Sequence, residues 1–331
     1  MEIGINAALD PATIDLQERL MRPFGTWRIM DWQRITVSNW EKAAFVPTKM
    51  ADLPISAELW RYRGGPWAAW HGVPLEWAAE AANDAKARLW VCIPHRFSRH
   101  EMAKFMLHVA QYAKHGVIFE YSNEVWNNGF LAHHDCTAFG KRWNMATDWT
   151  AALHWAAEQT LAMARIAKGL GDSDVSVVLS GQCSNEWVID QMLPRCAHVI
   201  DAIAIAPYFG HRPNGSAPPA LSEMSAEIEV LADKVAKHRA IADRYELQLW
   251  CYEGGQHVMG ADSAELNRSE QMGDLYQVFL GMLESAGVDL ACLYNIASDY
   301  DAGDSWGLWD VLEGKAELTA KSEEVLKWLN N

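Results

Sequence analysis

Eight apolar runs of strand length, separated by amphipathic helical stretches, are the feature that most restricts how this chain can fold. Strands that alternate with helices are typical of a parallel sheet covered by helices. Eight such strands favour closure of the sheet, so the sequence predicts an α/β fold, a (β/α)8 TIM barrel. The predicted strands are 2–7, 26–32, 88–94, 116–123, 175–181, 200–207, 247–253 and 289–296.

Apolar residues recur at helical spacing between these runs, which predicts helices that pack on the outside of the barrel. We expect these stripes to face the barrel and to have no part in binding a cofactor. Three of them are Met102, Phe105, Met106, Val109 and Ala113; Trp149, Leu153, Ala157 and Leu161; and Met272, Leu275, Tyr276, Phe279 and Leu283.

The 331 residues are 50% hydrophobic, enough for one large core, so we expect a single domain over 1–331. Long irregular loops are predicted after the second and fourth strands, at 33–74 and 125–147. Such loops belong at the C-terminal face of a barrel, where enzymes of this fold keep their active sites. They contain Trp40, Trp60, Trp67, Trp70, Trp126, Phe130 and Trp143. Flat rings with a polar edge suit a carbohydrate cleft, although we expect most of the tryptophans to be core residues.

Two glutamates stand at the ends of predicted strands, Glu124 after the fourth and Glu253 after the seventh. A barrel brings strand ends that are distant in sequence to one mouth. Cleavage of a glycosidic bond needs one carboxyl that holds a proton for the leaving oxygen and one ionised carboxyl that faces the anomeric carbon. The pair therefore predicts a glycosidase. Alternation along the fourth strand puts Glu120 on the same side as Glu124 but deeper in the barrel.

The stretch Phe119-Glu120-Tyr121-Ser122-Asn123-Glu124 resembles the fourth-strand motif of clan A glycoside hydrolases, and Trp250-Cys251-Tyr252-Glu253-Gly254 resembles their seventh-strand motif. More narrowly, 93–95, 121–127 and 252–257 are similar to a poorly characterised bacterial group of this clan, sometimes found alongside cellulose-binding modules. The resemblance spans all eight strands. It implies a retaining hydrolase that cleaves a β-linked oligo- or polysaccharide by double displacement, with the two carboxyl groups roughly 5 Å apart.

The same resemblance implies roles for single residues. Glu124 is the acid/base and Glu253 the nucleophile, while Asn123 binds the 2-hydroxyl of the sugar. Glu120 has a structural role and pairs with Arg28. The remaining substrate contacts are expected from strand ends and loops, at Arg28, Asp31, His95, Trp126, Tyr208, His257 and Trp306, with Tyr208 also hydrogen-bonded to the nucleophile.

The chain departs from the clan pattern at Tyr252, where many members have Thr, and at Asn295, where many have Trp at the end of the eighth strand. We expect the two catalytic carboxyls to titrate as a coupled pair. Partial burial and the charge of Glu253 should raise the pKa of Glu124, whereas hydrogen-bond donors should keep Glu253 ionised.

A second Asn-Glu pair, Asn185-Glu186, is predicted to be structural. Ser184 is a suitable N-cap for the following helix, and an acidic residue in the first turn is favoured by the helix dipole. Glu186 is therefore not expected in the active site.

The chain carries 28 Lys+Arg and 43 Asp+Glu, and its net charge of −15 opposes binding to nucleic acid or an anionic membrane. The predicted partner is an oligo- or polysaccharide, and no cofactor or metal is expected. Phosphate-binding glycine motifs are absent from the sequence, and no predicted strand carries a lysine that could form a Schiff base. The metal-ligand residue types at 133–136 have no partner group with a recognised spacing.

The N-terminus has no basic start followed by an apolar segment, and no run approaches membrane-spanning length. We expect either a cytoplasmic protein or a mature or excised extracellular domain. Cys92, Cys251 and Cys292 lie in strand-like runs, where buried thiols are expected rather than disulfides. The alternative function is a catalytically silent carbohydrate-binding or structural barrel protein of a cell surface or virion. The sugar, linkage, endo or exo mode and oligomeric state stay open at this stage.

Overall fold

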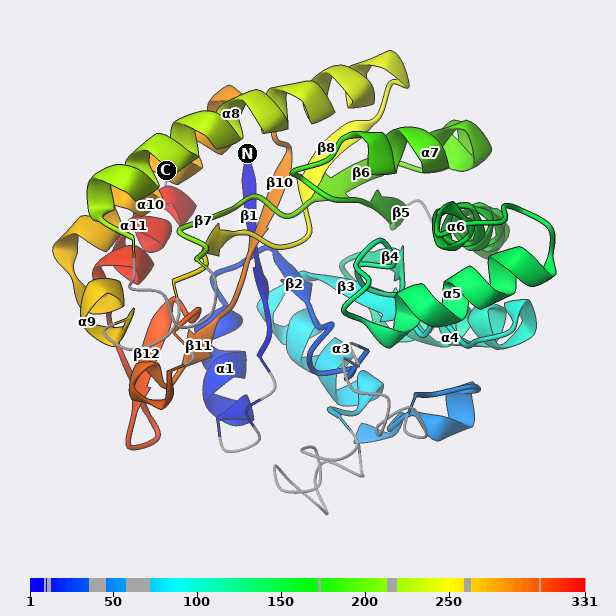
Figure 1. Cartoon of the computed structure of the whole chain (residues 1–331). Helices are drawn as coiled ribbons and strands as arrows, with labels where there is room; N and C mark the ends of the chain where they lie inside the picture. The colour runs from blue at the N-terminus through cyan, green and yellow to red at the C-terminus, as the bar shows by residue number, and fades with distance from the viewer. Residues whose placement is uncertain are drawn as a thin grey trace.

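The computed structural model describes residues 1–8, 10, 13–35, 46–57, 72–171, 174–212, 219–258, 263–303 and 305–330. Within them, eight parallel strands close into a barrel in the order β1-β10-β8-β6-β5-β4-β3-β2 (Figure 1). The barrel strands are β1 (Glu2–Asn6), β2 (Thr26–Arg28), β3 (Arg88–Ile93), β4 (Val117–Tyr121), β5 (Val175–Ser180), β6 (Ala202–Ile205), β8 (Gln248–Cys251) and β10 (Leu290–Leu293). Each lies within one of the eight predicted runs, so the predicted (β/α)8 barrel is confirmed.

Helices form a layer around the strands (Figure 1). The described helices are α1 (Ile14–Met21), α3 (Leu75–Ala85), α4 (Arg99–Tyr112), α5 (Leu131–Arg142), α6 (Thr150–Leu170), α7 (Trp187–Cys196), α8 (Leu221–Arg244), α9 (Ser263–Arg268), α10 (Glu270–Ser285) and α11 (Ala320–Leu329), with short 3-10 turns at η2 (Met50–Asp52), η3 (Ala197–Val199) and η4 (Tyr300–Ala302). The predicted stripes lie on α4, α6 and α10, and most of their residues are buried. The exceptions are Ala113, which follows α4 and is half-buried, and Trp149, which precedes α6 and is 46% exposed.

Local sequence signals fix several helix ends. The Ser98 hydroxyl accepts a hydrogen bond from the backbone N–H of Glu101 and caps α4, and the Ser269 hydroxyl caps α10 by accepting from Met272 N–H. α6 ends at Gly171, whose backbone is left-handed with φ of 69°. These ends direct the chain back to the next strand of the barrel.

The core has two layers, as the period-2 alternation of barrel strands requires. Outward side chains pack against the helices, while inward side chains fill the barrel. The inward set combines large and small residues, namely Trp90, Ile118, Val178, Ala202, Ala204, Trp250, Tyr252, Leu290 and Cys292. The rings of Trp90 and Trp250 meet edge-on with centroids 5.7 Å apart, so the barrel interior is packed below its mouth. All six cysteines are buried and unpaired.

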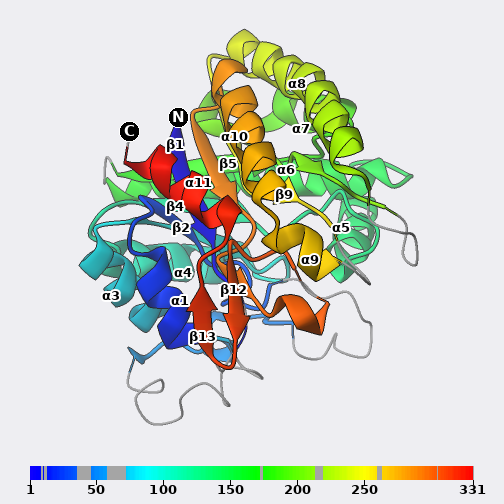
Figure 2. The same cartoon turned by 90° about the vertical axis from the view of Figure 1, so that its left-hand side faces the viewer.

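Two small sheets extend the barrel. β7 (Tyr208–Phe209) pairs with β9 (Gly255–Gln256), which ties the chain after β6 to the chain after β8. The other sheet contains β11 (Ala297–Ser298), β12 (Trp309–Leu312) and β13 (Lys315–Glu317). Figure 2 shows the β12–β13 hairpin projecting from the edge of the barrel.

Segment 125–147 differs from its prediction, because it contains α5 and is not irregular throughout. The apolar face of α5 is narrow, with Leu131, Cys136 and Gly140 among polar neighbours, so its helical period is weak in the sequence. Trp40, Trp60, Trp67 and Trp70 lie outside the described residues. In the described part of the chain, no helix is both long and apolar enough to cross a bilayer.

Gly140 permits the close packing of α5 on α6, and a matched glycine tests this. A Cβ at Gly140 would lie 2.2 Å from the carbonyl oxygen of Ala151, whereas a Cβ at Gly169 in α6 would meet nothing within 4 Å. We expect Gly140→Ala to lower the free energy of unfolding by about 1–3 kcal/mol, because the two helices must separate. Gly169→Ala should leave it unchanged or raise it by up to about 1 kcal/mol. Urea unfolding measures both, and equal effects would contradict this account of α5.

Candidate active site

The strand ends bring one group of polar side chains to the mouth of the barrel. Arg28 is the last residue of β2, Glu120 lies in β4, and Glu253 follows β8 by two residues. All three are buried. Residues that are far apart in the sequence therefore share one site, as the strand pattern predicts.

Arg28 holds this group together. Its Nη1 donates to Oε1 of Glu253 at 2.8 Å and to Oδ1 of Asn6 at 3.1 Å. Its Nη2 donates to Oε2 of Glu120 at 2.9 Å and to Oδ1 of Asn123 at 2.7 Å. The predicted pairing of Glu120 with Arg28 is confirmed. A buried arginine needs such acceptors, because removing its charge from water is costly.

Glu124 reaches the mouth through a left-handed turn. Ser122 and Glu124 have φ of 61° and 44°, so the strand alternation ends after β4 and both Asn123 and Glu124 point to the site. The half-buried Glu124 carboxyl accepts hydrogen bonds from Asn127 Nδ2 at 2.8 Å and from the Tyr252 hydroxyl at 2.9 Å. Its two oxygens are thus held by two neutral donors.

Glu253 is held by different groups. Its Oε1 accepts from Arg28, and its Oε2 accepts from the Tyr208 hydroxyl at 3.0 Å. The predicted hydrogen bond between Tyr208 and Glu253 is therefore confirmed. Burial and the neighbouring carboxylates raise the pKa of Tyr208 and of Tyr252 well above the usual phenol value, so both phenols keep their protons and act as donors.

Burial raises the pKa of both glutamates. For Glu124, burial outweighs the hydrogen bonds from Asn127 and Tyr252, which lower its pKa. For Glu253, burial and the charge of Glu124 outweigh the attraction of Arg28 and raise the pKa to about 8. The expected rise in the pKa of Glu124 is confirmed, with burial as its main cause, whereas the expectation that hydrogen-bond donors keep Glu253 ionised is wrong. The physical reason is that Glu253 is buried and shares Arg28 with Glu120.

Aromatic rings line the Glu253 side of the site. The His257 ring lies 5.5 Å from Tyr208, 4.6 Å from His211 and 5.3 Å from Trp306, measured between centroids. Trp306 in turn lies 5.8 Å from Tyr294. Burial and the adjacent His211 lower the pKa of His257 to about 4, so this histidine is neutral at physiological pH. The predicted site residues Tyr208, His257 and Trp306 thus form one continuous wall.

Several residues of the site were not predicted from the sequence, among them Asn6, which accepts a hydrogen bond from Arg28. Tyr294 donates its hydroxyl to Oδ2 of Asp31 at 2.9 Å, and its ring also faces Tyr208. Asn295 stands where many clan members have Trp, and the preceding Tyr294 supplies an aromatic side chain to the site. The peptide bond between Tyr294 and Asn295 is cis. Tyr252 and Asn127 bind Glu124 but appeared in the motifs only as a departure and a flanking residue. Tyr294 could have been predicted, because it is an aromatic residue directly after the end of β10.

His95 forms its side-chain hydrogen bond with Asp135 and with neither glutamate of the carboxyl pair. Its Nε2 is 2.9 Å from Oδ2 of Asp135, which also accepts from Arg96 Nε at 2.7 Å. Asp135 therefore positions the β3–α4 loop from α5. Among the residues that the structure describes, no group of three or more His, Cys, Asp or Glu side chains could hold a metal ion.

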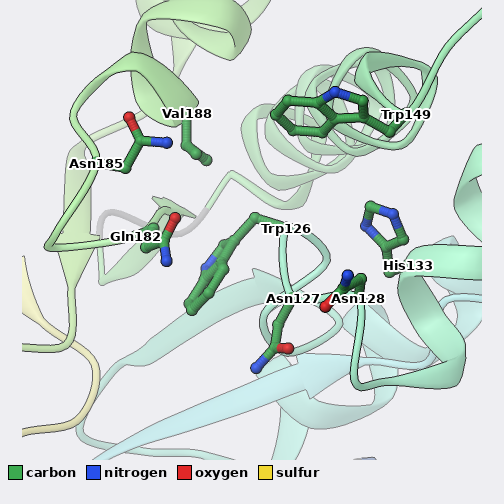
Figure 3. Close-up of a pocket in the computed structure, with 8 residues that line it drawn as sticks. All are labelled: Trp126, Asn127, Asn128, His133, Trp149, Gln182, Asn185 and Val188. Carbon is green, nitrogen blue, oxygen red and sulfur yellow. The ribbon is translucent and has the colours of Figure 1, made fainter.

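A cavity of about 530 Å³ adjoins the Glu124 side of the site (Figure 3). It lies between the loop after β4 and the loop after β5. Trp126 lies in its lining, together with Trp149 from the start of α6. The expectation that Trp149 packs on the barrel exterior is wrong, because its position just before the first turn of α6 directs the ring into this cavity.

Glu186 lies outside the carboxyl pair, as predicted, and forms an ion pair with Lys237 at 3.2 Å. The predicted cap is wrong, however, because α7 begins after Glu186 and Ser184 is two residues too early. Asn185 lines the cavity beside Glu124, so this second Asn-Glu pair does border the site.

No protein-family model matches the chain, and no curated protein matches its sequence. Solved structures do match. A GH51 α-L-arabinofuranosidase from Thermotoga petrophila has 14% identity and a TM-score of 0.60, over 95% of this chain and 62% of that one. A GH51 arabinofuranosidase from Xanthomonas axonopodis pv. citri has 11% identity and a TM-score of 0.63, over 98% and 69%. A Bacteroides ovatus GH5 xyloglucanase has 11% identity and a TM-score of 0.56, over 100% and 75%.

The likeness to these glycoside hydrolases is one of fold: this chain has the same TIM barrel as these clan A enzymes. It spans less than two thirds of the Thermotoga petrophila enzyme.

Because the pKa of Glu253 is raised in the folded state, we expect its contribution to the free energy of unfolding to depend on pH. A carboxyl with a folded-state pKa of about 8 and an ordinary value of 4.5 is protonated in both states at low pH, and costs the folded state progressively more as pH rises between these values. We expect Glu253→Gln to stabilise the protein relative to wild type by roughly 4 kcal/mol more at pH 8.5 than at pH 5. Denaturant unfolding across this pH range measures the difference.

Glu229→Gln, which changes an exposed glutamate on α8, is the matched control and should show no such trend. A Glu253→Gln effect that stays constant with pH would contradict the raised pKa.

Proposed function

We propose that this protein is a retaining glycoside hydrolase that cleaves a β-linked oligo- or polysaccharide. The observation that carries the proposal is the pair Glu124 and Glu253 at the mouth of one barrel, each held by its own set of donors. The two carboxyls have different environments: neutral donors surround Glu124, whereas an arginine binds Glu253. Different environments are what a proton donor and a nucleophile require.

In the proposed reaction, the ionised Glu253 attacks the anomeric carbon while Glu124 gives its proton to the leaving oxygen. The bond to the leaving group breaks, and a glycosyl ester forms on Glu253. Glu124, now ionised, takes a proton from water, whose oxygen attacks the anomeric carbon and releases Glu253. Arg28 and Tyr208 orient the Glu253 carboxylate throughout, and Asn123 is positioned beside Glu124 for the 2-hydroxyl.

The raised pKa of Glu124 fits the role of proton donor, whereas the pKa of about 8 at Glu253 opposes ionisation of the nucleophile at neutral pH. Glu124 must hold a proton at working pH, and burial favours that form. Glu253 must lose its proton to react, and the Arg28 ion pair provides the stabilisation of that ionised form. We infer that the pair carries one proton in its reactive state.

The printed names of the similar structures define the substrates to test. They include α-L-arabinofuranosidases and a xyloglucanase, so a panel should contain arabinofuranosides besides β-linked glucans, xylans, mannans and galactans.

Covalent trapping tests the nucleophile. A 2-fluoro glycosyl fluoride slows hydrolysis of the glycosyl ester, so the proposed mechanism predicts one added glycosyl mass on Glu253. Mass spectrometry of peptides locates the label. Glu253→Gln should abolish it, while Glu186→Gln, at the second Asn-Glu pair, should leave labelling unchanged.

Sugar binding without any product or label across the whole panel would instead favour the silent carbohydrate-binding barrel. Labelling of another carboxyl would refute the assignment of Glu253.

The tyrosines test the assignment of roles. Tyr252 donates to Glu124 and Tyr208 to Glu253, and each hydrogen bond stabilises an ionised carboxylate. Tyr252→Phe should therefore raise the pKa of Glu124 and move the alkaline limb of the kcat/KM profile up by roughly one pH unit. Tyr208→Phe should raise the pKa of Glu253 and move the acid limb up instead. The opposite pairing of variants and limbs would reverse the proposed roles.

A further inference from the structure

The cavity beside Glu124 adjoins the group that is proposed to protonate the leaving oxygen. Asn127 both lines the cavity and donates to the Glu124 carboxyl at 2.8 Å. A general acid protonates the leaving oxygen, so the space on its far side from the nucleophile receives the leaving group. None of the lining residues is among the described partners of the Glu253 carboxyl, Arg28 and Tyr208.

The lining has the chemistry of a sugar site. Trp126 and Trp149 provide indole faces that can stack on the apolar side of a sugar ring. Amide side chains at 127, 128, 182 and 185 can both donate to and accept from hydroxyl groups (Figure 3). The Trp126 Nε1 donor is buried and has no hydrogen-bond partner within the described residues. A volume of about 530 Å³ is within the roughly 300–1,000 Å³ of small-molecule pockets.

The lining also selects against charged sugars. Among the described residues, no Lys, Arg, Asp or Glu lines the cavity. His133 is the one titratable group among the described lining residues. Burial lowers its pKa, and its Nδ1 lies 2.9 Å from the carbonyl oxygen of Val125. A uronic acid or sulfated sugar would therefore lose water at its anionic group without gaining a cationic partner.

The cavity continues onto an exposed aromatic surface. The Trp149 ring contacts Trp187 with centroids 5.2 Å apart, and these side chains are 46% and 39% exposed. Two adjacent exposed indoles offer stacking beyond the first sugar unit.

We propose, on the basis of the proposed hydrolase function, that this cavity is a leaving-group subsite that binds neutral glycosyl units of an oligo- or polysaccharide. Trp126 and Trp149 stack on the sugar rings, and the surrounding amides bind their hydroxyls. Specificity for the leaving group therefore resides in the loops after β4 and β5.

Binding to the Glu253→Gln variant tests the subsite without turnover. Neutral xylo-, cello-, manno- and arabino-oligosaccharides are compared with oligogalacturonides by isothermal titration calorimetry. We expect at least one neutral series to bind and the acidic series not to bind. Added Trp149→Ala should weaken binding by about tenfold or more, as loss of a buried indole contact does. Asn128→Ala is a second, exposed lining variant, which should also weaken binding.

Trp143→Ala is the matched control, because Trp143 is 68% exposed and does not line the cavity. It should leave binding within about twofold. Tighter binding of oligogalacturonides, or equal effects of the Trp149 and Trp143 variants, would overturn the proposal.

Kinetics assign the cavity to the leaving-group side. In an otherwise wild-type enzyme, Trp149→Ala should lower kcat/KM about tenfold or more for a bound neutral oligosaccharide, yet leave that for a nitrophenyl glycoside of the same sugar within about twofold. Equal losses on both substrates would refute the leaving-group assignment. If Glu253 is labelled but Trp149→Ala changes neither binding nor kcat/KM, the hydrolase function is supported and the subsite proposal is refuted. Trp149-dependent sugar binding with no label on Glu253 would refute the hydrolase while supporting a neutral-sugar site.

Discussion

The four-way hydrogen bonding of Arg28 is the constraint on which the barrel mouth depends. One buried guanidinium binds Glu120 in β4, Glu253 after β8, Asn123 after β4 and Asn6 in β1. A buried arginine is tolerated only when such acceptors replace water. Because its partners come from three other strands, the guanidinium fixes the relative positions of strand ends that the chain alone does not connect. Removing Arg28 would leave Glu120 and Glu253 buried without a cation. Burying the guanidinium costs free energy of desolvation, but its hydrogen bonds hold these side chains in one arrangement.

The count of charges explains why protons stay in the site. Among the residues that the structure describes, one arginine faces Glu120 and Glu253, with Glu124 nearby, so negative groups outnumber positive ones in this buried region. Protonation is then favoured, and the pKa values of Glu124 and Glu253 both rise. The neutral His257 adds no compensating charge. The two carboxyls therefore retain a proton near neutral pH, and the ion pair with Arg28 only partly offsets the cost of ionising Glu253.

The sequence predicted the barrel well because its signal is local: each of the eight strands is an apolar run bounded by helical periodicity. The Arg28–Glu120 and Tyr208–Glu253 contacts were also predicted, from motif resemblance. The role of Tyr294 and the exposure of Trp149 were not, because they depend on how loops fold after the strands end. The raised pKa of Glu253 could not be predicted either, since it follows from burial and from the sharing of one arginine. Such properties belong to the three-dimensional environment and leave no periodic trace.

The two sides of the carboxyl pair are built in different ways. On the Glu253 side, rings from the chain after β6, β8 and β10 contact one another, so a change in one disturbs its neighbours. On the Glu124 side, the loops after β4 and β5 border an amide-lined cavity, and of its described lining residues only Asn127 also binds one of the two carboxyls. Substitutions in these two loops can therefore alter the shape and chemistry of the cavity without changing the arginine network. A barrel divided in this way can vary its ligand while its buried charges stay the same.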